Sequence, residues 1–132
     1  MTQIKADRIL ELSTSTGFGD IALAGAIVGY RTFSSVCADG DTFEYFAEAI
    51  DTNGAATGDW ETGLATWHTG NIMTRTGIYS SSNAGVAVIW TAGTKRIALS
   101  IVSETMNTID ENFAAMAVSL IDLQTLVITN IN

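Results

Sequence analysis

The spacing of apolar residues changes near Ser103, and this change divides the chain into two parts of different secondary structure. Before it, apolar and polar residues tend to alternate, as at Ile97, Leu99 and Ile101, and alternation predicts strands with one buried face. The chain has 12 Gly and no Pro, which favours short strands joined by glycine turns. We therefore expect a mainly β fold, a compact β-sandwich or small β-barrel of about eight strands, followed by a C-terminal α-helix.

Glycine, asparagine and aspartate separate the expected strands. Asp39–Asp41 and Asn53–Gly54 predict hairpin turns, because Gly accepts a positive φ without steric cost and Asn or Asp tolerates it. The expected strands are Arg8–Ser13, Asp20–Ala24, Tyr30–Val36, Thr42–Ala47, Trp60–Thr66, Ile72–Tyr79, Val86–Thr91 and Arg96–Ile101.

After Ser103 the apolar residues recur at alternating intervals of 3 and 4 residues, which places them along one side of a helix. Thr108 and Glu111 form a capping box, so we expect the helix to run from about Ile109 to about Thr125. Residues 1–104 are expected to form the β-domain, with a short N-terminal arm over 1–6, and residues 105–132 a helical oligomerisation tail. The apolar seam consists of Met106, Ile109, Phe113, Met116, Leu120, Leu123 and Val127.

This tail needs a surface to pack against, because Ala114, Ala115, Ala117 and Val118 widen its apolar surface beyond the seam. The positions beside the seam lack the opposite charges that specify a long autonomous coiled coil. One expectation is that the tail associates with the same segment of sister subunits, as a homotrimer. The alternative is that it docks on its own β-domain. We favour the trimer and regard the seam as its interface.

Charge and hydropathy exclude several classes of partner. The formal net charge is −8, so nucleic acid and anionic lipid surfaces would repel the chain on average. No apolar run reaches the roughly 20 residues that a membrane span requires, so no membrane insertion is expected. Met1–Lys5 leads into charged residues without an apolar segment, which argues against a secretory signal. The single Cys37 fits synthesis in a reducing cytoplasm, although it could still pair between subunits.

Residues able to carry out covalent chemistry are few and isolated. His68 is the only histidine, and we interpret it as a surface residue beside a turn rather than a general base. The serines at 80–82 lack a nucleophile-elbow motif and are interpreted as loop serines. Cys37 is interpreted as a small buried apolar residue, because Asp39 and Asp41 would oppose its thiolate. We expect no catalytic residue, no cofactor and no enzymatic activity.

A run of carboxylates without Lys or Arg lies between Arg31 and Arg75. Asp51 begins a stretch similar to the start of a calcium loop, but the twelfth position is Thr62, which cannot supply a bidentate carboxylate, so an EF-hand is excluded. A looser cation site is an alternative. The preferred interpretation is a solvated acidic face that can meet a basic partner, with no metal bound. The run comprises Asp39, Asp41, Glu44, Glu48, Asp51, Asp59 and Glu61.

Three tryptophans, Trp60, Trp67 and Trp90, could stack on sugars, but in a small β-domain such residues more often fill a core or an interface. Glycan contact through Trp60 and Trp67 is therefore kept as a lesser possibility. It would make the chain a carbohydrate-binding module for host attachment.

Several short motifs follow one another in order along the chain. They are Thr16–Ala26 followed by Gly29–Phe33, then Asp59–Gly63, then Thr74–Thr76, and finally Ser81–Asn83 through Trp90–Arg96. Their order and spacing resemble a group of small tailed-bacteriophage virion proteins, which run as a T-G-x-G-x-x-x-L-x-G-A start, a D-W-E-x-G middle, an R-T element with S-S-N, and an A-G-T-K end. This chain departs from the pattern at Ala65 and Trp67, where relatives tend to have Gly and Tyr.

The resemblance covers about Asp7 to Val102 and implies a structural or attachment role in the virion. It also implies that the protein is made in the host bacterial cytoplasm. Such domains occur as short virion proteins and as parts of longer tail-fibre proteins. The leading expectation is a capsid decoration, cement or head-fibre subunit that assembles as a homotrimer and binds capsid or tail proteins. The alternative is a tail-fibre base or adaptor subunit.

Overall fold

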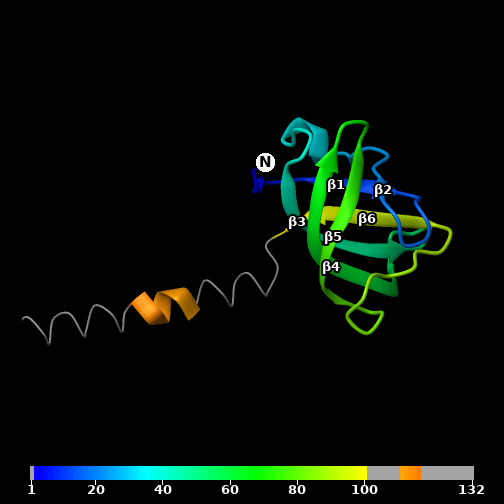
Figure 1. Ribbon diagram of the computed structural model, residues 1–132. Coiled ribbons are helices and arrows are strands. Elements are labelled where there is room, and N and C mark those ends of the chain that lie inside the picture. The colour runs from blue at the N-terminus through cyan, green and yellow to red at the C-terminus, as the bar shows by residue number, and fades with distance from the viewer. Residues whose placement is uncertain (1, 101–110, 117–132) are drawn as a thin grey trace, which may run out of the picture. The chain divides into compact units, whose positions relative to one another are not determined.

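The computed structural model describes residues 2–100 and 111–116 (Figure 1). The chain divides into two compact units, Met1–Val102 and Ser103–Asn132.

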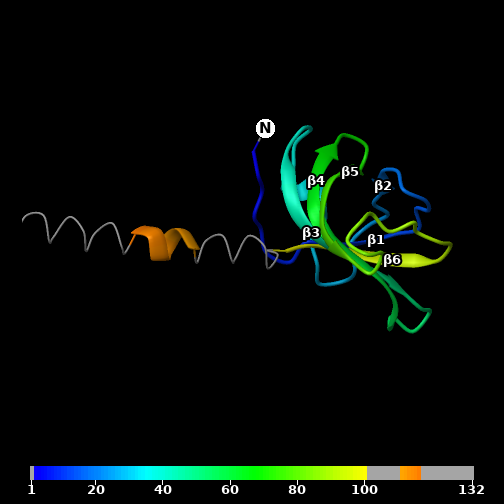
Figure 2. The same cartoon turned by 60° about the horizontal axis from the view of Figure 1, so that its bottom comes forward.

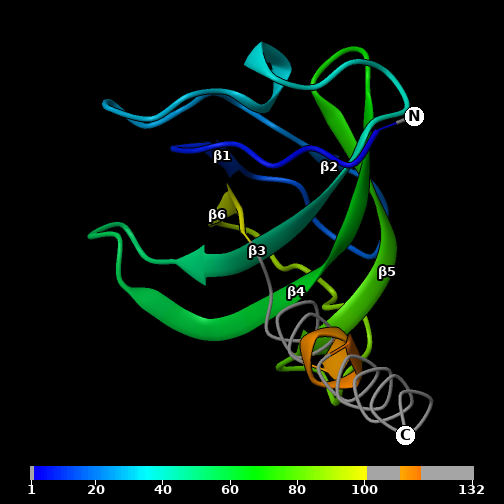
Figure 3. The ribbon, with the colours of Figure 1, turned by 90° about the vertical axis from the view of Figure 1, so that its left-hand side faces the viewer.

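The first unit is built almost entirely from antiparallel strands, which confirms the expected mainly β fold. Its described residues form one six-stranded sheet in the order β1-β6-β3-β4-β5-β2. Figure 3 shows the strands curving around a common interior as a nearly closed barrel. The elements are β1 (Leu10–Ser13), β2 (Ile21–Ala22), the 3₁₀ helix η1 (Phe33–Ser35), β3 (Thr42–Ile50), β4 (Ala56–His68), β5 (Ile72–Ser81) and β6 (Thr94–Leu99).

Backbone hydrogen bonds between the edge strand β1 and the segment that follows β2 bring the barrel close to closure. Leu12 of β1 donates its N–H to the carbonyl of Gly25, which follows β2, and accepts from the N–H of Ala24. Glu11 forms an antiparallel bridge with Ala26. The edge groups of β1 are therefore paired within the chain, and paired edges do not template contact with another sheet.

The hairpin of β3 and β4 is the longest element of the barrel, and Figure 2 shows its turn projecting from the end of the sheet. Asp51 holds this turn by accepting from the backbone N–H groups of Asn53 and Ala55 at 2.8 and 3.0 Å. Gly54 adopts a φ of 85° there. The hairpin expected at Asn53–Gly54 is confirmed.

The core lies inside the barrel and is filled by alternate residues of the strands. Phe43 of β3, Trp67 of β4 and Ile97 of β6 are each at most 3% exposed. Phe33 of η1 packs against Phe43 with 4.5 Å between ring centroids and stacks on Trp67 at 6.0 Å. The 3₁₀ helix thus inserts an aromatic side chain into the barrel interior.

Two expected strands are absent from the described part of the chain. Over Tyr30–Val36 the backbone forms η1 instead, because Phe33 is drawn into the core. Over Val86–Thr91 the chain is a loop that keeps only a bridge between Trp90 and Gly17. In that loop the backbone of Val88 hydrogen-bonds to the buried side chains of Glu61 and Arg75 instead of to a neighbouring strand.

One turn differs from expectation. Asp39–Asp41 does not join two strands; it leads from η1 into β3, with the N–H of Gly40 donating to the carbonyl of Trp67. The β4–β5 hairpin turns between the two strands expected at Trp60–Thr66 and Ile72–Tyr79, where Gly70 and Asn71 both adopt positive φ.

Candidate functional site

Glu61 is the central residue of a polar network inside the barrel. It occupies an inward position of β4, in phase with Ala65 and Trp67, and is completely buried. Its Oε1 accepts from Arg75 Nη1 at 3.0 Å and from the backbone N–H of Val88 at 2.9 Å. Its Oε2 accepts from the hydroxyl of Tyr45. Both carboxylate oxygens are therefore satisfied, which a buried charge requires.

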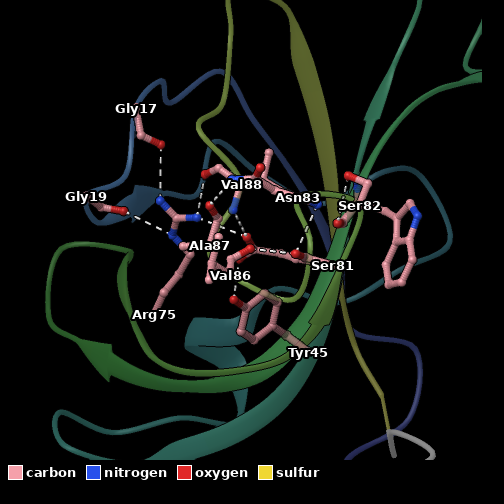
Figure 4. Close-up of polar contacts among 12 residues, drawn as sticks. Gly17, Gly19, Tyr45, Arg75, Ser81, Ser82, Asn83, Val86, Ala87 and Val88 are labelled. Carbon is pink, nitrogen blue, oxygen red and sulfur yellow. Dashed lines mark hydrogen bonds and ion pairs between the residues drawn. The ribbon is translucent and has the colours of Figure 1, made fainter.

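Arg75 lies opposite Glu61 and connects it to two loops. Beyond its bond to Glu61, Nη1 donates to the carbonyl of Val88 at 2.8 Å, and Nη2 and Nε donate to the carbonyls of Gly17 and Gly19 at 3.1 and 3.3 Å. Figure 4 shows the guanidinium directed at these groups. The side chain is 3% exposed. The ion pair thus fastens the loop before β2 and the loop before β6 to the strands.

Tyr45 completes the network from β3. Burial raises the pKa of its hydroxyl far above the usual value, and the negative charge of Glu61 raises it further. Tyr45 therefore remains protonated and donates its hydrogen to Glu61. This role is that of a hydrogen-bond donor and not of a proton acceptor.

Two more buried charged residues hold backbone segments in the same way. Glu11 accepts from the N–H of Gly25 at 3.1 Å and of Phe33 at 2.7 Å. Lys95 donates to the carbonyls of Thr91 and Gly93, and burial lowers the pKa of its amine. The interior charges therefore fix loops, and none of these contacts leaves an activated nucleophile.

These buried ionic contacts were missed by sequence reasoning. Alternation along β4 places Glu61 in phase with Ala65 and Trp67, which is a signal that this carboxylate faces the core. Its partner Arg75 comes from another strand, in the register that pairs Ala65 with Arg75. No local pattern identifies that partner.

The residues considered for catalysis lie apart. His68 Nδ1 lies 3.8 Å from Asp39 Oδ1, its Nε2 shares a hydrogen bond with Thr74 Oγ1 at 2.9 Å, and its side chain is 42% exposed. The register of β4 and β5 pairs His68 with Ile72 and Thr62 with Ser80, so the histidine and the serines at 80–82 occupy opposite ends of this hairpin. They do not form a hydrolytic arrangement.

The serines hold a turn. Ser81 donates its hydroxyl to the carbonyl of Val86, and Ser82 Oγ accepts from the backbone N–H of Trp60 at 3.0 Å (Figure 4). Cys37 is partly buried against the core, and burial followed by the charge of Asp41 raises the pKa of its thiol to about 11. Its thiol is therefore protonated at neutral pH.

The carboxylates between Arg31 and Arg75 do not form one solvated acidic face, and the structure corrects that expectation. Glu44 and Glu61 are buried, and Glu48 pairs with Arg96 on the neighbouring strand. Asp39, Asp41 and Asp51 accept backbone hydrogen bonds in turns. Carboxylates that are close together in the sequence therefore take part in separate turns, ion pairs and buried contacts. The described residues contain no cluster of three or more His, Cys, Asp or Glu that could hold a metal ion.

The structure also corrects the expected glycan contact at Trp67. Its ring is 3% exposed and stacks on Phe33, so no face is free for a sugar. Trp60 is 37% exposed and occupies an outward position of β4. Neither tryptophan lines the two shallow cavities of about 360 and 160 Å³, which are formed by Lys5, Ala6, Asp7, Leu99 and Ser100, and by Asp59, Ser82, Asn83, Val88 and Ile89.

In the second unit, residues 111–116 are helical and all of them are exposed. Phe113 and Met116 of the expected seam lie on this helix, with 63% and 54% of their surfaces exposed. No helix of the described residues is long and apolar enough to cross a membrane. The other seam residues, Met106, Ile109, Leu120, Leu123 and Val127, lie outside the described residues, as does most of the expected helix.

Residues from the ordered motif stretches of the sequence meet around the buried ion pair. Gly17 and Gly19 belong to the first stretch, Glu61 to the second and Arg75 to the R-T element. Trp90, which belongs to the final stretch, exchanges backbone hydrogen bonds with Gly17. Motifs that are far apart in the chain thus serve one structural network.

Comparison with protein-family models, curated proteins and solved structures found no match to this chain.

Proposed function

We propose that this protein is a non-enzymatic structural subunit of a tailed-bacteriophage particle, a capsid decoration, cement or head-fibre protein that assembles as a homotrimer. In this proposal the β-barrel is the body that contacts the particle. The tail with the apolar seam joins the subunits. The protein would be made in the bacterial cytoplasm and would reside in the virion.

The convergence of the motif residues on the buried ion pair carries this proposal. Glu61 and Arg75 use their hydrogen bonds on Tyr45 and on the backbone of Gly17, Gly19 and Val88. Catalysis or ligand binding requires functional groups at an accessible site, whereas the charged groups of Glu61 and Arg75 are buried and hold loops in place. Motif residues used in this way support a scaffold role. A virion subunit needs a stable shape and interfaces.

The exposed seam residues support assembly through the tail. Phe113 and Met116 are large apolar side chains, and each leaves more than half of its surface exposed. Burying them against sister subunits would remove that surface from water, which favours association. Three helices joined along such a seam would form a short coiled coil.

The solution mass tests this assembly. We expect multi-angle light scattering to give the mass of a trimer for the full chain, and of a monomer for Phe113→Ser/Met116→Ser. Val28→Ser is the matched control, because Val28 is 98% exposed in the barrel unit and should leave the mass unchanged. A monomeric full chain would overturn the trimer.

The position on the particle tests the virion role. We expect labelled protein to be spread over the icosahedral shell when particles that contain it are imaged. Labelling confined to the tail would replace the decoration role with a tail-fibre base or adaptor role. Particles without the protein would contradict both.

A further inference from the structure

Two exposed apolar residues lie next to a backbone bridge between neighbouring loops of the barrel. Gly17 and Trp90 form an antiparallel bridge with both backbone hydrogen bonds, at 2.8 and 3.1 Å. Trp90 is buried, whereas the residues beside the bridge, Phe18 on one loop and Ile89 on the other, are exposed. They are 63% and 53% exposed. We call this pair the Phe18–Ile89 knob.

The backbone beneath the knob is held by the buried ion pair. The residues on both sides of Phe18 present their carbonyls to Arg75, which binds Gly17 at 3.1 Å and Gly19 at 3.3 Å. Val88, directly before Ile89, donates its N–H to Glu61 and accepts from Arg75. A loop fixed in this way loses little conformational freedom on binding, and such preorganisation favours affinity.

The surroundings of the knob are acidic. Asp20 follows Gly19 and is exposed, and Asp59 lines a cavity together with Ile89. The charge of Arg75 is buried and compensated by Glu61. Lys95 is also buried. The knob is thus an apolar contact with carboxylates beside it and no exposed cation among these neighbours.

We propose that the Phe18–Ile89 knob is a docking site for another protein that offers an apolar face flanked by Lys or Arg. Charge complementarity selects this occupant over a second copy joined at the same site, because that contact would bring Asp20 and Asp59 against their equivalents. The proposal rests on the barrel loops alone. It is independent of the trimer and of the virion role.

The test uses two defined probes, an amphipathic helical peptide of Leu and Lys and a matched peptide of Leu and Glu. We expect amide chemical-shift changes on the full-length protein to cluster at residues 17–20 and 86–90 with the Lys peptide. Binding should weaken by about tenfold in Phe18→Ser and in Ile89→Ser, because truncating a central apolar anchor removes most of its contribution. Asp20→Asn/Asp59→Asn should also weaken it and reduce its salt dependence.

Val28→Ser is the control. Val28 is an exposed apolar residue outside the knob, so this substitution should leave the affinity for the Lys peptide unchanged. Equal binding of the Glu peptide would overturn the charge assignment. Absent binding, or shifts that map away from residues 17–20 and 86–90, would overturn the site. A loss of self-association in Phe18→Ser would assign the knob to a second copy and overturn the proposed partner.

Discussion

Glu61 and Arg75 form an ion pair with 3.0 Å between Oε1 and Nη1, and their side chains are 0% and 3% exposed. The barrel contains a second pair, Glu48 with Arg96, in which the side chains are 16% and 31% exposed. The two pairs therefore differ in their access to water. If one partner is lost, water can hydrogen-bond to the remaining partly exposed group of the Glu48 pair, but it cannot reach the buried group of the Glu61 pair.

Replacing Glu61 with Gln should lower the free energy of unfolding by about 3–5 kcal/mol, because the charge of Arg75 would remain buried without its carboxylate. Glu48→Gln is the matched control and should cost less than about 1 kcal/mol, since its pair is partly solvated. Urea denaturation measures both. Equal losses in the two variants would contradict the structural role given to Glu61.

Gly63 and Gly77 provide a second matched comparison on neighbouring strands. A Cβ on Gly63 would lie 2.2 Å from the carbonyl oxygen of Gly77, whereas a Cβ on Gly77 would meet nothing within 4 Å. Gly63→Ala should therefore lower the free energy of unfolding by about 3 kcal/mol or more, and Gly77→Ala by less than about 1 kcal/mol. Thermal unfolding of the two variants checks this. A Gly63→Ala protein as stable as Gly77→Ala would show that these strands can separate at no cost.

Ionisation of Tyr45 should make the fold less stable in alkali. Its pKa is raised in the folded protein, so the stabilisation is complete below the unfolded value of 10.0 and is lost as the pH rises above it. Tyr45→Phe should cost about 1–3 kcal/mol at neutral pH, because Glu61 Oε2 loses its donor. The gap between wild type and Tyr45→Phe should narrow as the pH rises above 10. Urea denaturation across this range tests it, and a constant gap would show that Tyr45 is not the titrating group.

The thiol of Cys37 should react slowly in the folded protein. With a pKa of about 11 against 9.0 for a free thiol, its thiolate fraction at pH 8 falls by about 100-fold. We expect alkylation by iodoacetamide, followed by mass spectrometry, to be slower by about that factor in buffer than in urea. Similar rates under both conditions would place the thiol in solvent.

Secondary structure near a strong local signal could be predicted, and the polar network could not. The hairpin at Asn53–Gly54 follows from two residues that accept a turn conformation, so its position depends on neighbours in the chain. The local sequence also predicts a strand at residues 30–36. In the structure Phe33 packs in the core and residues 33–35 form a 3₁₀ helix. Tertiary packing overrides local preference there.

By itself the sequence determined the features that depend on spacing: strands with one apolar face, turns at glycine, and a helix-forming segment near the C-terminus. Only the tertiary structure decided that Glu61 and Arg75 meet Gly17, Gly19 and Val88, and that Gly17 pairs with Trp90. The physical reason is that these groups are distant along the chain. Strand register and barrel closure bring them together, and both arise from long-range contacts rather than from the preferences of neighbouring residues.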